Sequence, residues 1–122
     1  MKQLYIKPTS KSLEVTLEDG YLIFKGCSIN NDPRNFFTPI KNWVLEYMTD
    51  PKEITKVDMH FEYIDTSSVK YLFEILKELK SVINSQNKLE LNWYYEKDDP
   101  EVLELGEIMQ SKLGVDFNFE AV

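Results

Sequence analysis

The hydrophobic and polar positions change their period at the centre of the chain. Over residues 57–63, hydrophobic and polar residues alternate, which predicts a strand with one buried face. Over residues 69–83, hydrophobic residues recur every three or four positions, which predicts an amphipathic helix. Only Asp65-Thr66-Ser67-Ser68 separates the two patterns. Three hydroxyl side chains therefore lie where a strand gives way to a helix, beside backbone N–H groups that have no partner within the helix.

The same two periods predict strands and helices along the rest of the chain. The expected strands cover residues 5–6, 13–17, 21–26, 89–95 and 116–121, and the other expected helices begin near Pro33 and Pro100 and end before Asp50-Pro51 and at Gly114. Asp19-Gly20 supplies a hairpin turn between the second and third strands. We therefore expect a single domain over residues 1–122, an α/β fold whose mixed sheet has an N-terminal hairpin and parallel later strands.

Alternation within the later strands assigns their two faces. Parallel strands covered by helices on both sides are usually hydrophobic throughout, whereas residues 57–63 and 89–95 alternate. We therefore expect the helices mainly on one face of the sheet. The face toward the helices is expected to carry Val57, Met59, Phe61 and Tyr63. The other face is expected to carry Asp58, His60, Glu62, Glu90, Asn92 and Tyr94.

Local signals add predictions about helix starts and packing. Asp32-Pro33 and Asp99-Pro100 each place a capping residue before a proline suited to the first helical position. Pro39 lies inside the first helical pattern, so this helix either kinks there or restarts at Thr38-Pro39. Gly106 costs its helix about 1 kcal/mol relative to alanine, which indicates that another element packs closely against it.

Composition and charge narrow the functional class. The chain has 14 Lys and Arg against 21 Asp and Glu, a formal net charge of -7 that disfavours nucleic acid and anionic membranes as partners. No apolar run reaches spanning length, and Lys7 and Pro8 interrupt the start before a signal-peptide core forms, so we expect a cytoplasmic protein. Cys27 is the only cysteine, which excludes an intramolecular disulfide, and we expect it to be a small buried residue.

Residues suited to catalysis or metal binding are few. His60 is the only histidine, and a nucleophile pair would need one particular long-range contact with it. Glu96, Asp98, Asp99 and Glu101 form an acidic group without the spacing and glycine of a calcium loop, and acidic residues are common in a first helical turn. The four glycines are isolated, so there is no glycine-rich phosphate loop. We expect no enzyme, cofactor or metal; an enzyme built on His60 and the acidic group stays a third hypothesis.

The run Asp65-Thr66-Ser67-Ser68 permits two interpretations. In the first, the run does no more than start the helix, because these residue types are the preferred helix N-caps. Alternatively, one hydroxyl is phosphorylated, because a phosphate gains from the helix N-terminus and adds nearly two negative charges beside Asp65 and Glu62. The fold would survive while the surface charge changed, which a regulatory switch requires.

Three blocks of sequence, in order and spanning nearly the whole chain, resemble one known family. They are Phe61-Glu62-Tyr63-Ile64-Asp65-Thr66-Ser67-Ser68-Val69-Lys70, the earlier Phe36-Phe37-Thr38-Pro39-Ile40-Lys41-Asn42-Trp43, and the later Trp93-Tyr94-Tyr95 with Asp98-Asp99 and Glu104-Leu105-Gly106-Glu107. These blocks resemble the bacterial SiaC family of regulatory phosphoproteins. More loosely, the strand, the Asp-hydroxyl-hydroxyl run and the helix resemble the STAS domains of anti-sigma-factor antagonists.

The resemblance implies a STAS-like partner-switching protein. In the SiaC family a cognate kinase phosphorylates the threonine of the Thr-Ser-Ser run, a PP2C-type phosphatase removes the phosphate, and the unphosphorylated form binds and activates a diguanylate cyclase, raising cyclic di-GMP. Carried over by position, the phosphorylated residue is Thr66, while the STAS comparison shifts it to Ser67. The expected partner-binding residues are Asp65, Ser67, Ser68 and Lys70. The alternative is a STAS-like binding module without phosphorylation control, which holds a small molecule or a fixed protein partner.

Overall fold

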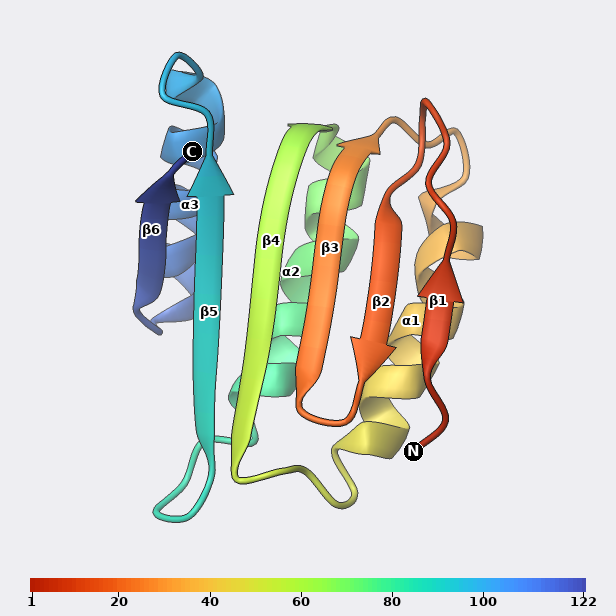
Figure 1. The fold of residues 1–122 in the computed structure, drawn as a ribbon, viewed down its shortest axis with the longest axis vertical. Helices are drawn as coiled ribbons and strands as arrows, with labels where there is room; N and C mark the ends of the chain where they lie inside the picture. The colour runs from red at the N-terminus through yellow and green to blue at the C-terminus, as the bar shows by residue number, and fades with distance from the viewer.

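The computed structural model describes residues 1–122 as one six-stranded sheet with three helices (Figure 1). In chain order the elements are β1 (Leu4–Ile6), β2 (Glu14–Glu18), β3 (Tyr21–Ser28), α1 (Pro33–Tyr47), β4 (Ile54–Ile64), α2 (Thr66–Lys80), β5 (Lys88–Tyr95), α3 (Pro100–Leu113) and β6 (Phe117–Ala121). The strands lie in the sheet in sequence order. β1, β2 and β3 pair antiparallel, whereas β3, β4, β5 and β6 pair parallel. The predicted mixed sheet with its N-terminal hairpin is confirmed.

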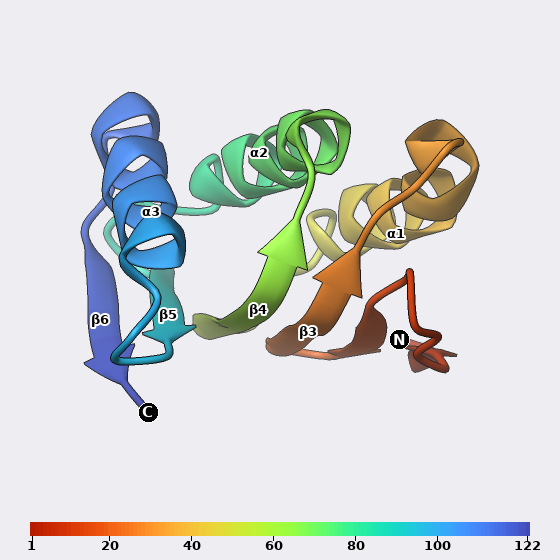
Figure 2. The same cartoon turned by 90° about the horizontal axis from the view of Figure 1, so that it is seen from above.

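All three helices cover the same face of the sheet (Figure 2). The crossovers run from β3 to β4, from β4 to β5 and from β5 to β6, always one strand further in the same direction. Because such crossovers are almost always right-handed, steps in one direction leave every helix on one side. The predicted one-sided arrangement is confirmed. None of the helices combines the length and hydrophobicity that a membrane span needs.

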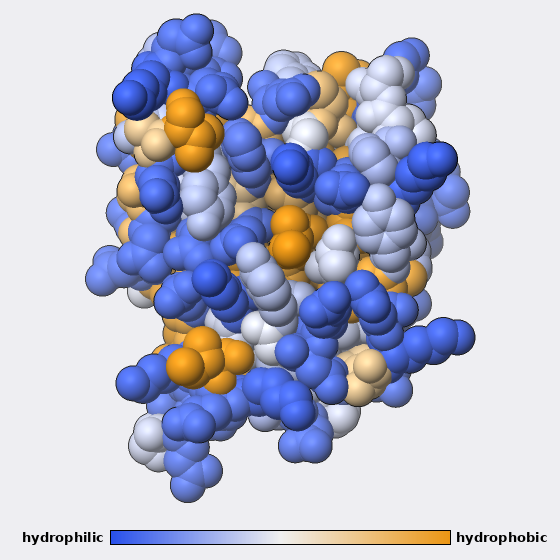
Figure 3. Space-filling model, in the orientation of Figure 1, coloured by the Kyte–Doolittle hydropathy of each residue, from blue (hydrophilic) through white to orange (hydrophobic).

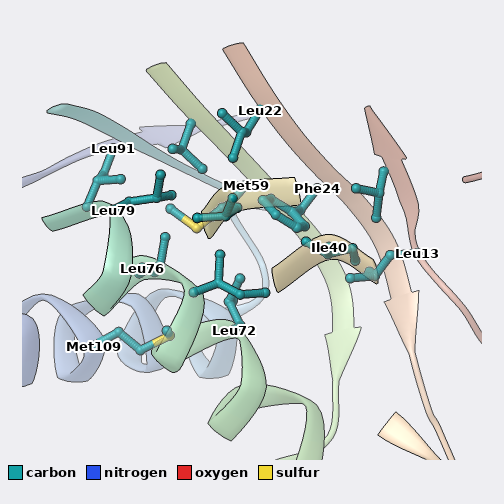
Figure 4. Close-up of a cluster of buried hydrophobic side chains, with 14 of the residues drawn as sticks. Leu13, Leu22, Phe24, Ile40, Met59, Leu72, Leu76, Leu79, Leu91 and Met109 are labelled. Carbon is teal, nitrogen blue, oxygen red and sulfur yellow. The ribbon is translucent and has the colours of Figure 1, made fainter. Parts of the chain in front are cut away.

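The hydrophobic core lies between the covered face of the sheet and the helices. Figure 4 shows Phe24 of β3 and Met59 of β4 beside Leu72 and Leu76 of α2, and all four side chains are fully buried. Fully burying a side chain of this kind stabilises the fold by about 1.5–3 kcal/mol. The period-two pattern of β4 and the three-and-four pattern of α2 therefore meet in one layer, which explains why both periods were visible in the sequence.

The predicted close approach at Gly106 is confirmed. A Cβ atom added at Gly106 would lie 2.6 Å from ring atoms of Trp93, a fully buried residue of β5. The Trp93 indole Nε1–H donates to the backbone carbonyl of Val102, one turn earlier on α3, at 3.0 Å. The absence of a side chain at Gly106 thus lets α3 rest directly on the indole ring.

The predicted capping residues begin α1 and α3. The Asp32 side chain accepts a hydrogen bond from the Asn35 amide at 3.3 Å, and the Asp99 side chain accepts one from the Val102 amide at 3.2 Å. A proline follows each cap within the first helical turn, where its missing N–H group has no cost.

The helix α1 does not restart at Thr38-Pro39. It runs without interruption from Pro33 to Tyr47, with Pro39 in its interior. The Thr38 hydroxyl donates to the carbonyl of Arg34 at 2.6 Å, in the turn that the proline weakens. Of the two alternatives for this segment, the structure excludes the fresh start.

A β-bulge where β3 meets β4 corrects two predictions. The register shifts between Gly26 and Cys27, which leaves Glu62 without a partner on β3. The extra residue turns Tyr63 outward, 52% exposed, and buries Ile64 in its place, so the prediction that Tyr63 faces the helices is wrong. The prediction of a buried Cys27 is also wrong, because this residue is half-buried with its thiol 3.5 Å from the Glu62 carboxylate. Partial burial, and then this contact, raise the pKa of the Cys27 thiol.

Candidate functional site

Asp65 joins the end of β4 to the start of α2. Its backbone is extended, and its Oδ1 atom accepts hydrogen bonds from the Ser68 amide at 2.9 Å and from the Ser67 hydroxyl at 3.2 Å. The helix therefore begins at Thr66, and residues 66–68 form its first turn. The N-cap interpretation holds for Asp65, because its carboxylate satisfies a backbone N–H group that the helix leaves unpaired.

The second carboxylate oxygen of Asp65 binds the segment that follows β3. It accepts from the Asn30 amide at 3.1 Å, while the Asp65 amide donates to the Ser28 carbonyl at 2.9 Å. Beneath these contacts, the Ser28 hydroxyl donates to the Ser68 hydroxyl at 2.8 Å and accepts from the Asn30 side-chain amide at 3.2 Å. We call Ser28, Asn30, Asp65, Ser67 and Ser68 the junction cluster; it connects the C-terminal ends of two adjacent parallel strands.

Two opposing effects act on the Asp65 carboxyl group. Partial burial raises its pKa, but hydrogen bonds from Ser68, Asn30 and Ser67 stabilise the charged form and together lower the pKa below the ordinary value of 3.8. Asp65 is therefore ionised at neutral pH. Its negative charge lies at the N-terminal end of α2, where the helix dipole favours it.

The three hydroxyl groups differ in their access to solvent. Thr66 is exposed, Ser67 is half-buried, and Ser68 is fully buried. Ser68 lies beneath the surface, where its amide holds the Asp65 carboxylate and its hydroxyl holds Ser28. Lys70, one helical turn after Thr66, is exposed and forms no ion pair.

The sequence did not single out two members of the junction cluster. Ser28 and Asn30 lie about 35 to 40 positions before their partners in the chain. The sequence near them contains the turn-forming run Asn30-Asn31-Asp32, which indicated the start of a helix. Nothing in this run indicated that the segment contacts residue 65.

The open face of the sheet is largely hydrophilic, with separate hydrophobic patches (Figure 3). The Tyr21 hydroxyl donates to Asp58 at 2.6 Å, the Asn92 side-chain amide donates to Asp58 at 2.9 Å, and Asn118 donates to Asn92 at 3.0 Å. The hydrogen bond to Asp58, followed by burial, raises the pKa of Tyr21 to about 12. These polar groups satisfy one another across four strands, in agreement with the predicted polar face.

The structure does not assemble a catalytic or metal-binding group from the other candidates. The nearest charged partner of His60 is Glu96, with Nε2 and Oε1 3.5 Å apart. Asp99 is committed to capping α3, and Asp98 is exposed. No three His, Cys, Asp or Glu side chains lie together in a geometry that could hold a metal ion. The third hypothesis, an enzyme built on His60 and the acidic group, gains no geometric support.

Comparison with known proteins decides the family. Residues 6–122 match the SiaC family, which is described as the SiaC family regulatory phosphoprotein. The chain belongs to the SiaC family. The match spans nearly all of the fold, from the end of β1 to the last residue, so the resemblance found in the three sequence blocks is confirmed.

Individual relatives match the chain over nearly its whole length. An uncharacterised protein of Pseudomonas aeruginosa (strain UCBPP-PA14) is 24% identical over 123 residues, covering 99% of this chain and 98% of the relative. The crystal structure of apo-SiaC from P. aeruginosa superposes with a TM-score of 0.83 at 24% identity, covering 99% of this chain and all of the other. SiaC in complex with the diguanylate cyclase SiaD, whose activator it is, gives 0.89 at 24% identity, covering 98% and 99%. At this identity the structures establish a common fold.

Proposed function

We propose that this SiaC-family chain is a non-enzymatic partner-switching regulator. In this proposal the unphosphorylated chain binds and activates a diguanylate cyclase, a cognate kinase phosphorylates Thr66, and a PP2C-type phosphatase restores the binding form. The family membership supports a regulatory phosphoprotein, and the complex of the P. aeruginosa relative supports a cyclase as partner. The observation that carries the proposal is the exposed Thr66 hydroxyl at the first position of α2.

Access and hydrogen bonding favour Thr66 over the two serines. Ser68 is fully buried against Ser28, and Ser67 donates its hydroxyl to Asp65. Modifying either serine would break part of the junction cluster. Thr66 makes no side-chain hydrogen bond, so its hydroxyl is free to accept a phosphoryl group without breaking a contact. Ser67 stays the alternative site.

A phosphate on Thr66 would change the surface more than the fold. It adds about 1.5 to 2 negative charges at neutral pH beside the ionised Asp65. The free N–H groups of the first turn and the helix dipole offset part of this repulsion. A partner that buried the phosphate without a cation would lose several kcal/mol, and each 1.4 kcal/mol is about tenfold in affinity. Phosphorylation therefore releases the partner while α2 stays folded.

Intact-mass measurement tests the phosphorylation step. The chain is incubated with ATP and each candidate kinase of the source organism, alongside Thr66→Ala and Ser67→Ala as matched variants. The proposal expects one added phosphate on the wild type and on Ser67→Ala, and none on Thr66→Ala. A phosphate that persists in Thr66→Ala but disappears in Ser67→Ala assigns the site to Ser67.

Cyclase assays test the partner step. Diguanylate cyclases of the source organism are expressed and purified individually, and cyclic di-GMP formation is measured with and without the chain. The proposal expects one cyclase to be stimulated by the unphosphorylated chain and not by the phosphorylated one. Equal stimulation by both forms would contradict the switch and favour a STAS-like module that holds its partner without phosphorylation control.

A further inference from the structure

Strand β6 forms an open edge of the sheet. It pairs with β5 on one side only, and the strand at the other edge is β1 (Figure 1). β1 has three residues and Pro8 follows it closely, both features that discourage further pairing. β6 has five residues, contains neither proline nor lysine, and carries one charge, that of Glu120. β6 therefore lacks most of the features with which proteins block the edge of a sheet.

The hydrogen bonds around β6 show which of its backbone groups are free. The Val122 amide donates to the Tyr95 carbonyl of β5 at 2.9 Å. Because successive residues of a strand direct their backbone groups to opposite sides, even-numbered residues of β6 face β5 and odd-numbered residues face the open edge. The Phe117 amide agrees with this, since it donates outside the sheet to the Gln110 side chain at 2.7 Å. The residues whose backbone N–H and C=O groups stay free at the edge are Phe119 and Ala121.

A row of aromatic side chains ends at the same edge. The ring centroids of Phe61 and Trp93 lie 5.4 Å apart, those of Trp93 and Phe117 6.0 Å, and those of Phe117 and Phe119 5.9 Å. The first three side chains are buried, whereas Phe119 is only partly buried. A further aromatic ring on a neighbouring strand would bury Phe119 and continue the row.

We propose that β6 pairs with β6 of a second copy of the chain, about a two-fold axis at Phe119. In an isologous interface the same surface meets itself, so the two strands run antiparallel. Phe119 then lies opposite the partner subunit's Phe119 and extends the aromatic row. The two sheets join into one continuous sheet, which removes the open edge from both copies.

The other two central registers of this pairing are unfavourable. Edge-facing residues must lie opposite one another, which places the axis at residue 118, 119 or 120. An axis at residue 118 would put Phe117 opposite Phe119 and would need the Phe117 amide, which already donates to Gln110. An axis at residue 120 would put two Glu120 carboxylates directly opposite each other, and like charges in this position destabilise strand pairing.

An axis at Phe119 avoids both problems. The two Phe119 residues exchange N–H···O=C bonds, and the Ala121 amide donates to the carbonyl of the partner subunit's Phe117. On the open face, Asn118 lies opposite the partner subunit's Glu120, so an amide group meets a carboxylate. The Asn118 side-chain amide has two N–H donors, of which its hydrogen bond within the chain uses one. The edge of β6 is therefore complementary to itself in this register.

The pairing leaves the candidate phosphorylation site accessible. Thr66 follows β4, which lies two strands away from β6 in the sheet. A dimer presents two copies of this site, and a two-fold symmetric cyclase binds such a dimer with greater avidity than it binds one chain. Only this last consequence rests on the proposed function; the self-association does not depend on it.

Light scattering with matched variants tests the self-association. The molar mass is measured from low micromolar to several hundred micromolar chain, because one pair of strands buries less surface than a stable dimer interface. We expect the mass to rise toward twice that of one chain. Ala121→Pro removes an edge-facing N–H and leaves the ladder with β5 intact, so it should weaken the association at least tenfold, whereas Ala121→Ser keeps the N–H and should stay within twofold. Thermal unfolding establishes that each variant is folded. A wild type that stays monomeric throughout, or an Ala121→Pro variant that associates like the wild type, would overturn the proposal.

Disulfide cross-linking tests the register. In a Cys27→Ser background, Asn118→Cys and Glu120→Cys are oxidised separately and as a mixture, at a concentration at which the wild type is dimeric. We expect the mixture to form disulfide-linked dimers at least tenfold faster than either variant alone. In the proposed register residue 118 lies opposite residue 120, with Cα atoms about 4.5 Å apart and within the range of a disulfide. If either variant alone is linked as fast as the mixture, or if no combination is linked, β6 does not pair with itself about Phe119.

Discussion

Replacing Gly106 by alanine should destabilise the protein although it improves the helix. In an isolated helix the change would stabilise by about 1 kcal/mol. Here the new methyl carbon would lie 2.6 Å from atoms of the Trp93 ring, which is almost an ångström shorter than an ordinary van der Waals contact distance. The indole cannot move aside freely, because it is fully buried and donates a hydrogen bond to Val102 on the same helix.

The net effect follows from the two opposing contributions. Overpacking a core by one methyl group costs about 1–3 kcal/mol, and the rigid surroundings of Trp93 place this site toward the upper end. After subtraction of the helix-propensity gain, we expect Gly106→Ala to lower the free energy of unfolding by about 1–2 kcal/mol. For a chain of this length that is a fall in Tm of roughly 5 °C. Urea and thermal unfolding followed by circular dichroism measure both quantities.

Two companion variants decide whether the steric reasoning is correct. Ser111→Ala, at an exposed position of the same helix, should be neutral or slightly stabilising, because it gains propensity without a clash. Trp93→Phe replaces the indole that a methyl group at residue 106 would approach. In this background Gly106→Ala should lower the free energy of unfolding by less than it does in the wild type, which corresponds to a coupling energy of at least about 0.5 kcal/mol. A Gly106→Ala variant as stable as Ser111→Ala would refute the reasoning.

Two other predictions concern ionisable groups. Because hydrogen bonds lower the folded-state pKa of Asp65, its charge stabilises the fold above the unfolded-state pKa, and this stabilisation is lost as the pH falls through the lower folded-state value. At pH 7 we therefore expect the free energy of unfolding of Asp65→Asn to lie about 1 kcal/mol below that of the wild type. This difference should shrink as the pH falls below about 4. A difference between the two proteins that stays the same at every pH in urea unfolding would contradict this. In Asp58→Asn, the pKa of Tyr21 should fall from about 12 toward 10, as measured by NMR titration of the phenol; an unchanged value would mean that Asp58 is not the cause.

Much of the architecture was encoded locally. Periods of two and of three-to-four residues located β4, α2 and the other main elements, because each period reports which side of one element is buried. The caps Asp32 and Asp99 depend only on the three residues that follow them. The three hydroxyl residues at positions 66–68 were also visible, and so was the family resemblance that the comparison confirmed.

The tertiary structure alone decided which of these hydroxyl groups is accessible. Ser68 is buried because Ser28, 40 positions earlier in the chain, lies against it on the adjacent strand, and Tyr63 is exposed because a bulge opposite Gly26 and Cys27 reverses its side. A hollow lined by Phe73 of α2 and by Leu105 and Ile108 of α3 likewise exists only because these two helices pack next to each other. Contacts between distant residues depend on the register in which strands pair and on how helices pack over them. The periodicity within one element shows which of its sides is buried, but it does not determine which residues of another element lie against that side.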